Sequence, residues 1–205
     1  MKLIFTRGNH DHIRSENKKN WVKTFGSPAG LITHKGVQIA WLNTYGSKLD
    51  WPENIKVINE IKTDLPLIIF THYQLVPDNY VAAKDKEAVI KLMAGKKSVA
   101  EAPEAIKPLL EKIAGCKGVI LVGHKNVAAS ARVGNMTQIN VPQTTEYPAG
   151  GVALKVYSDG VQISFVPIDD MYAEEYSRRR MAESSGRLRH RTRYTYPIWN
   201  QFLKW

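Results

Sequence analysis

The stretch LIIFTH, residues 67–72, is a run of four apolar residues that ends in a threonine and a histidine. A short, continuous apolar run bounded by polar residues is typical of a strand buried on both faces of a sheet. Two further runs fit this description: GVILVGH at 118–124, which also ends in a histidine, and residues 2–6, which lead into GNHD at 8–11. The chain is therefore expected to contain three buried strands whose ends carry polar, chemically active side chains.

Local patterns around these runs predict helices and hairpins. The predicted helices cover about 14–25, 52–62, 84–94 and 103–114. Hairpin turns are indicated by Lys35-Gly36 within 31–44, and by Gly134-Asn135 and Asp159-Gly160 within 132–168. A first half that mixes helices with buried strands, followed by a β-meander, places the chain in the α/β (α+β) class.

The composition is that of an ordinary globular chain. At 205 residues it is long enough for one domain with a sizeable core or for two small ones, and 43% of the residues are apolar and 23% charged. No apolar run approaches the roughly 20 residues that span a bilayer. The one cysteine, Cys116, excludes an internal disulfide and is expected to be a small buried hydrophobe.

The sequence leaves two alternatives for the cellular compartment. The apolar stretch in MKLIFTRG, at the N-terminus, is too short for a signal peptide. The chain is expected to be cytoplasmic if Met1 is the true start, and exported if a signal peptide has been lost upstream.

Histidine is the residue type that the ends of the three strands share: His10, His72 and His124. In sheets covered by helices, ligand sites gather beyond the carboxyl ends of strands, so these side chains could converge although they are far apart in sequence. Imidazole suits Zn, Fe and Mn-type sites, and the amide oxygen of Asn9 could complete the shell. The alternative for each histidine taken alone is a hydrogen-bonded side chain at the rim of the sheet.

The order of GNHD, a strand ending in THY and a strand ending in GH resembles the calcineurin-like metallophosphoesterase superfamily, over roughly residues 2–167. The resemblance implies a β-sandwich of mixed sheets flanked by helices, here without the N-terminal strands of that family. It also implies two divalent ions, Mn, Fe or Zn, about 3.5–4 Å apart, which bind the phosphate oxygens of an ester and generate a hydroxide for in-line attack.

The resemblance further implies roles for individual residues. Asn9, His72 and His124 would be ligands of the second metal ion. His10 would be catalytic, because it would face the phosphate and protonate or stabilise the leaving oxygen. Asp11 would orient His10, as carboxylates next to metal sites do.

Two departures from the family pattern concern the first metal ion. The Asp-x-His and Gly-Asp-x-x-Asp motifs of the family, which supply its bridging carboxylate, do not occur before Gly8. The closing Gly-His-x-His is replaced by GHKN at 123–126, so Asn126 would be a weak ligand with Lys125 beside it. At most one well-formed metal site is therefore expected, and a missing N-terminal segment or a complementing chain would have to supply the rest.

The formal net charge of +10 is concentrated at the C-terminal end. Residues 176–205 hold seven arginines and one lysine against Glu183, a net +7, and the rest of the chain is nearly balanced at +3. The predicted division is a partial metallophosphoesterase domain at 1–168 and a basic, aromatic-containing tail at 169–205.

Together these features predict a metal-dependent phosphoesterase that acts on phosphate mono- or diesters and is truncated, and so weak or inactive, as this chain alone. One alternative is a binding or scaffold module with a metallophosphoesterase-like fold and no catalysis. A second alternative is a basic nucleic-acid-binding protein that uses the tail to contact phosphates. No transmembrane segment is expected in any of the three cases.

Overall fold

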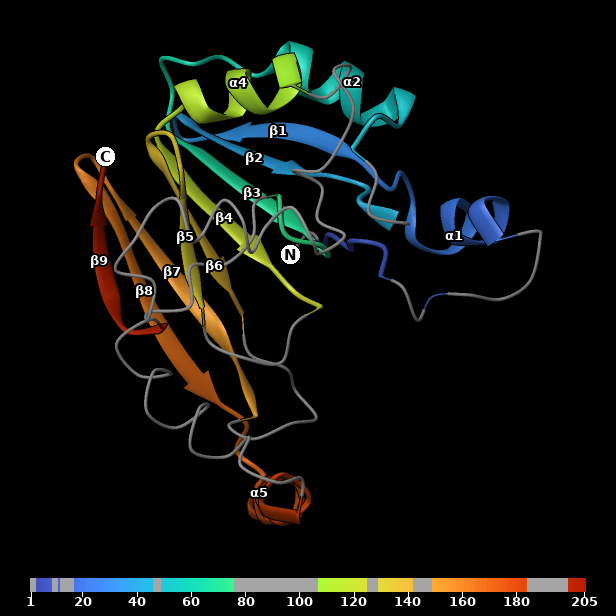
Figure 1. The fold of residues 1–205 in the computed structure, drawn as a ribbon, viewed down its shortest axis with the longest axis vertical. Helices are drawn as coiled ribbons and strands as arrows, with labels where there is room; N and C mark the ends of the chain where they lie inside the picture. Colours follow the sequence, from blue (N-terminus) through green and yellow to red (C-terminus); the bar gives the residue numbers. More distant parts are fainter. Residues whose placement is uncertain are drawn as a thin grey trace.

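The computed structural model describes residues 3–8, 11, 17–45, 49–75, 107–124, 129–141, 149–183 and 199–205. Three layers are stacked in this part of the chain: helices α2 (Pro52–Glu60) and α4 (Lys107–Gly115), a six-stranded mixed sheet, and a three-stranded antiparallel sheet (Figure 1). This mixed α/β architecture with helices beside two sheets confirms the predicted class. No helix in the described ranges is long and apolar enough to cross a membrane.

The larger sheet has the strand order β1-β2-β3-β4-β6-β5. Its strands are β1 (Gly30–His34), β2 (Val37–Trp41), β3 (Leu67–Thr71), β4 (Gly118–Val122), β5 (Ser130–Val133) and β6 (Met136–Asn140). Strands β2, β3, β4 and β6 are parallel, and β1 and β5 are antiparallel edge strands. The predicted turn between β1 and β2 is confirmed, because Lys35 and Gly36 both have positive φ, 48° and 78°, as a type I′ turn requires.

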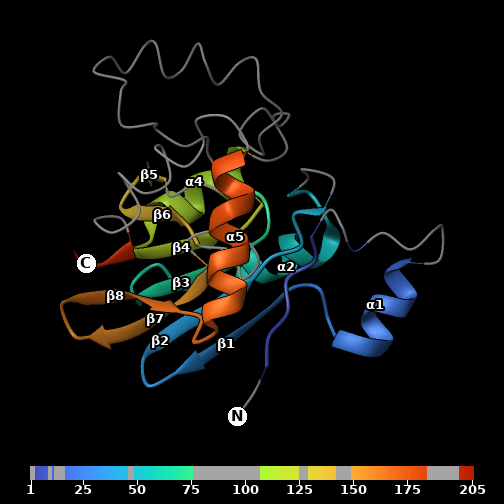
Figure 2. The same cartoon turned by 90° about the horizontal axis from the view of Figure 1, so that it is seen from below.

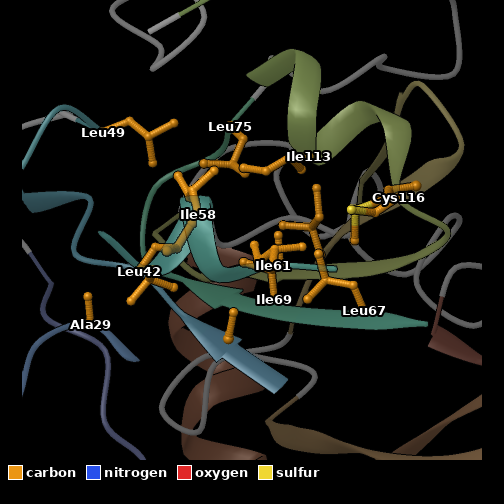
Figure 3. Packing of buried hydrophobic residues seen from close by; sticks show 14 of the residues in the cluster. Ala29, Leu42, Leu49, Ile58, Ile61, Leu67, Ile69, Leu75, Ile113 and Cys116 are labelled. Carbon is orange, nitrogen blue, oxygen red and sulfur yellow. The ribbon is translucent and has the colours of Figure 1, made fainter. Parts of the chain in front are cut away.

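The centre of this sheet is the pair β3–β4, whose apolar runs are buried on both faces. Leu67 and Ile69 of β3 pack in the core on the helix side, whereas Ile68 packs in the core against the second sheet. Figure 3 shows Leu67 and Ile69 together with Ile58 of α2 and Ile113 of α4. Burial on both faces explains why LIIF shows no alternation of apolar and polar residues.

Cys116 follows α4 and lies in the helix-side core, where it is fully buried. Its Sγ donates to the carbonyl oxygen of Lys112 at 3.4 Å. Burial raises the pKa of the Cys116 thiol, so the side chain stays neutral. The prediction of a small buried hydrophobe is therefore confirmed.

The smaller sheet consists of β7 (Gly150–Tyr157), β8 (Gly160–Pro167) and β9 (Gln201–Lys204), all antiparallel. Val161, Ile163 and Trp199 pack against the apolar face of the larger sheet. The indole N–H of Trp199 donates to the carbonyl oxygen of Asn140 in β6 at 2.6 Å, which ties the two sheets together.

Two parts of the basic tail are described, helix α5 and the end of the chain with strand β9. Helix α5 (Met171–Glu183) follows β8 and lies beyond the ends of the strands in Figure 1, with Tyr172 84% exposed. Figure 2, seen from that side, draws the helix in front of the sheets. The end of the chain returns at Trp199, which is 3% exposed, and β9 pairs with β8. The last residues thus belong to the smaller sheet, while the division of the chain at residue 168 stays a prediction.

The prediction of a buried strand at residues 2–6 is wrong. Residues 3–8 form no strand in the structure, and Leu3 and Phe5 are 65% and 41% exposed. Phe5 instead contacts Phe25 of α1 (Asn17–Phe25), with ring centroids 5.0 Å apart. An apolar run becomes a strand only where a neighbour can pair with its backbone. The position beside β2 is already occupied by β1.

The predicted helices near 14–25, 52–62 and 103–114 are found, within the described residues, as α1, α2 and α4. The predicted helix at 84–94 lies outside the described residues.

Asn54→Ala is expected to lower the free energy of unfolding by about 2–3 kcal/mol. The fully buried Asn54 side chain in α2 accepts from the N–H of Asn43 at 2.8 Å and donates to the carbonyl oxygens of Asn43 and Leu49 at 2.7 and 3.0 Å. Alanine would leave these buried backbone groups without their partner. Urea unfolding measures the effect, with Asn59→Ala on the exposed side of the same helix as the control. Equal midpoints for the two variants would contradict the role of Asn54.

Candidate functional site

Polar side chains gather at the carboxyl ends of β2, β3 and β4, which lie at one edge of the sheet because these strands are parallel. Thr44, after β2, and Thr71 of β3 share a hydrogen bond with 2.7 Å between their Oγ1 atoms. The N–H of Tyr73 donates to Thr44 Oγ1 at 2.9 Å, so the loops after β2 and β3 are fixed to each other.

The N-terminal segment reaches the same edge, and Figure 1 shows it close to the ends of β3 and β4. We call the resulting group the strand-end cluster. Its members are Arg7, Gly8, Asp11, Tyr45, His72, Tyr73 and His124.

The imidazole rings of His72 and His124 lie 5.1 Å apart between centroids, at an interplanar angle of 70°. A ring that binds an ion through nitrogen at about 2.1 Å has its centroid about 3.3 Å from that ion, so two rings on one ion are about 5 Å apart. The separation of the two histidines, predicted from separate strand ends, is therefore compatible with a shared ion.

His124 has a backbone φ of +66°, in the left-handed region that residues other than glycine rarely adopt. This conformation costs of order 1–3 kcal/mol and persists only where surrounding contacts fix it. The ring of His124 packs on the ring of Tyr73, with centroids 4.3 Å apart, as well as on His72. These ring contacts help to hold His124 at the end of β4 in spite of the strain.

Two glycines allow the backbone to approach the ring of His72. A Cβ added at Gly8 would lie 2.9 Å from Cε1 of His72, and one added at Gly123 would lie 3.4 Å from its Nδ1. A side chain at position 8 would displace the ring, and one at position 123 would be in tight contact. The backbone of the N-terminal segment and that of the loop after β4 thus both lie against the ring of His72.

Asp11 closes the turn that follows Gly8. Its Oδ2 accepts from the N–H of Gly8 at 2.6 Å, and its own N–H donates to the carbonyl oxygen of Gly8 at 3.3 Å. The carboxylate is therefore engaged with the backbone beside the two histidines. The predicted contact of Asp11 with His10 stays a prediction, because His10 lies outside the described residues.

Arg7 and Tyr45 also belong to the cluster, although neither is among the predicted site residues. The guanidinium of Arg7 lies over the ring of Tyr45, 3.9 Å from its centroid, and Arg7 is 5% exposed. Burial, and to a smaller extent the nearby Tyr45, raise the pKa of Tyr73, so its phenol is neutral at physiological pH. The signal available in the sequence is NTY at 43–45, a polar group that follows β2 as THY follows the apolar run of β3.

The structure therefore brings together two of the predicted metal ligands, His72 and His124, and places Asp11 on the adjoining turn. The remaining predicted site residues lie outside the described residues: Asn9, His10 and Asn126. Across the described ranges, no three side chains of His, Cys, Asp or Glu are grouped so that they could hold an ion. The described donor set is accordingly a pair of imidazoles.

No protein-family model matches this chain, and no curated protein matches it. Among solved structures, the chain is similar to one titled "GAP50 the anchor in the inner membrane complex of Plasmodium". The sequence identity is 12% and the TM-score 0.38, and the match covers 69% of this chain and 50% of that one. This chain therefore spans half the length of that structure, and a likeness of this size assigns no function.

These comparisons overturn the assignment to the calcineurin-like metallophosphoesterases. No family model matches this chain, and no curated protein matches it. GNHD, THY and GH are motifs of four residues or fewer, and three such motifs in order do not establish a family. A function for this chain therefore has to be inferred from the strand-end cluster.

Proposed function

We propose that this chain is a non-catalytic binding module in which His72 and His124 hold one divalent cation. The supporting observation is the 5.1 Å separation of the two rings at the ends of neighbouring strands. Imidazole suits Zn, Cu, Fe and Ni, and two imidazoles leave two positions of a tetrahedral zinc ion open. A side chain or an anionic group of a partner could fill these positions.

The donor set favours binding over ester hydrolysis. Hydrolysis by two metal ions requires both ions to be held about 3.5–4 Å apart around the phosphate. The two imidazoles are donors for a single ion, and Asp11 Oδ2 already accepts from the N–H of Gly8. The cluster as described supports one ion and no bridging group.

The basic tail gives less support to nucleic-acid binding than its composition indicates. In α5, Arg178 and Arg179 both bind the carboxylate of Glu175, at 2.6 and 2.8 Å. Hydrogen bonds from Arg179 and then Arg178 lower the pKa of Glu175, so this carboxylate is ionised at physiological pH. Two of the arginines are therefore partly neutralised within the helix.

The purified chain is expected to bind about one equivalent of Zn²⁺ at its two-imidazole site, in equilibrium dialysis with metal analysis. A generic aryl phosphate ester should be hydrolysed no faster than in buffer that contains the same metal. The binding should disappear in acid, where protons compete for the imidazole nitrogens.

Two results would reject this function. Absence of Zn²⁺ binding at neutral pH would remove the cation site. Binding of two equivalents, together with ester hydrolysis that EDTA abolishes, would favour the phosphoesterase instead of the binding module.

A further inference from the structure

Arg7 is a buried positive charge for which the described residues provide no anion. The residue is 5% exposed, and its buried Nε has no hydrogen-bond partner in the part of the chain that the structure describes. The contact recorded for its guanidinium is the face of the Tyr45 ring, 3.9 Å away. No carboxylate in the described ranges forms an ion pair with it.

Such a charge is costly to bury unless it is paired, because taking an ion out of water removes its hydration. Arginine cannot escape the cost by losing its proton, since its side chain stays charged in proteins. Stacking on Tyr45 compensates only in part, because a cation–π contact supplies no hydrogen-bond acceptor at the edge of the guanidinium.

The other charged groups of the strand-end cluster do not supply the missing anion. Asp11 accepts from the N–H of Gly8 and forms no ion pair with Arg7. His72 and His124 are either neutral or positive, and the burial-raised pKa of Tyr73 keeps its phenol uncharged. Apart from Asp11, the cluster therefore contains no negatively charged group that could pair with Arg7.

We propose that Arg7 anchors a binding site for an oxyanion, the phosphate, sulfate or carboxylate group of a ligand. A guanidinium binds such groups through two parallel N–H donors in its plane, and the ring of Tyr45 fixes that plane. The site goes beyond the proposed cation site and does not require it, because the anion is bound by Arg7 itself.

The test compares the wild-type chain with Arg7→Met and with Arg132→Met, all freed of divalent cations on a chelating resin so that no divalent cation and no soluble chelator takes part. Arg132 is the matched control, because it is an exposed arginine of β5 whose Nη1 donates to Oγ1 of Thr137 in β6. Calorimetric titration measures the binding of inorganic phosphate, sulfate and acetate at constant ionic strength. Binding of acetate as well as phosphate would identify a general oxyanion site, and binding of phosphate and sulfate alone a site for tetrahedral anions.

Arg7→Met is expected to weaken anion binding by at least about 30-fold, equivalent to about 2 kcal/mol, while Arg132→Met leaves it unchanged. Arg7→Lys keeps the charge and loses the planar pair of donors, so it should weaken binding by about 10-fold. This second variant also serves if methionine at position 7 prevents folding.

Thermal unfolding without added anion gives an independent result. Arg7→Met should unfold at the same temperature as the wild type or higher, because it removes an uncompensated buried charge. A lower unfolding temperature would show that Arg7 has a structural partner, and would overturn the proposal. Failure of the wild type to bind any anion would do the same.

Thermal unfolding with added phosphate or sulfate separates binding at Arg7 from a general stabilising effect of these salts. Phosphate and sulfate stabilise many proteins because they are excluded from the surface. Equal stabilisation of wild type, Arg7→Met and Arg132→Met would therefore overturn the site. Loss of the cation site by itself would leave anion binding in metal-free buffer unaffected, so the two proposals fail separately.

Discussion

His72→Ala and His124→Ala are each expected to weaken Zn²⁺ binding by at least about 100-fold. The described site has two imidazole donors with ring centroids 5.1 Å apart, so either substitution removes half of the protein's described ligands. Changing residues that only orient a metal ligand costs about 10–100-fold in affinity, and removing a ligand should cost more. The measurement is competition for Zn²⁺ against a chromophoric chelator.

The same substitutions should remove the stabilisation that the metal gives. At a free Zn²⁺ concentration of about 100 times the dissociation constant, the wild type should gain about 2.7 kcal/mol in free energy of unfolding. Both variants should gain almost nothing under that condition. His34→Ala is the control, because His34 is an exposed residue of the edge strand β1 and is not a member of the strand-end cluster.

The double variant tests whether the histidines share one ion. If they do, His72→Ala with His124→Ala should bind Zn²⁺ no more weakly than either single variant, because one substitution already disrupts the site. Two independent losses that add would show that each histidine binds a separate ion. Retention of wild-type affinity by either single variant would remove that residue from the site.

Much of the secondary structure follows from local patterns. LIIF and VILV are buried on both faces in β3 and β4, and Lys35-Gly36 makes the expected turn. Residues 2–6 show the limit of such patterns. An apolar run indicates that a segment can form a buried strand, whereas strand pairing needs a neighbouring strand, which can come from any part of the chain. Here β1 occupies the edge of β2, and Leu3 and Phe5 remain exposed.

The position of the candidate site can be predicted because parallel strands have their carboxyl ends at the same edge of the sheet. His72 and His124 end adjacent parallel strands, so their meeting follows from the strand assignment. Arg7 could not be predicted in this way, because arginine is normally exposed and no local pattern indicates its burial. The positive φ of His124 could not be predicted either, because residues other than glycine rarely adopt this conformation and no turn motif marks this position.

Gly118→Ala is expected to be the most destabilising single substitution considered, with a loss of at least about 4 kcal/mol. A Cβ at this position would lie 1.8 Å from the carbonyl oxygen of Leu67 and 2.8 Å from its carbonyl carbon, and the φ of Gly118 is +154°. Both atoms belong to the backbone of β3, which is paired with β4 in the middle of the sheet. Neither strand can move away without breaking contacts in the cores on both faces.

The matched control is Gly115→Ala, three residues earlier, where an added Cβ would meet nothing within 4 Å. Alanine at this helical position should be neutral or stabilise the chain by up to about 1 kcal/mol, because glycine is a poor helix former. Thermal unfolding should then separate the two variants by about 10 °C or more, since 1 kcal/mol shifts the midpoint by about 2–4 °C in a chain of this size. Similar midpoints would mean that β3 and β4 are not packed as closely at Leu67 and Gly118 as the structure shows. The alignment of His72 with His124 depends on the register of that pair, so the proposed cation site would then lose its structural basis.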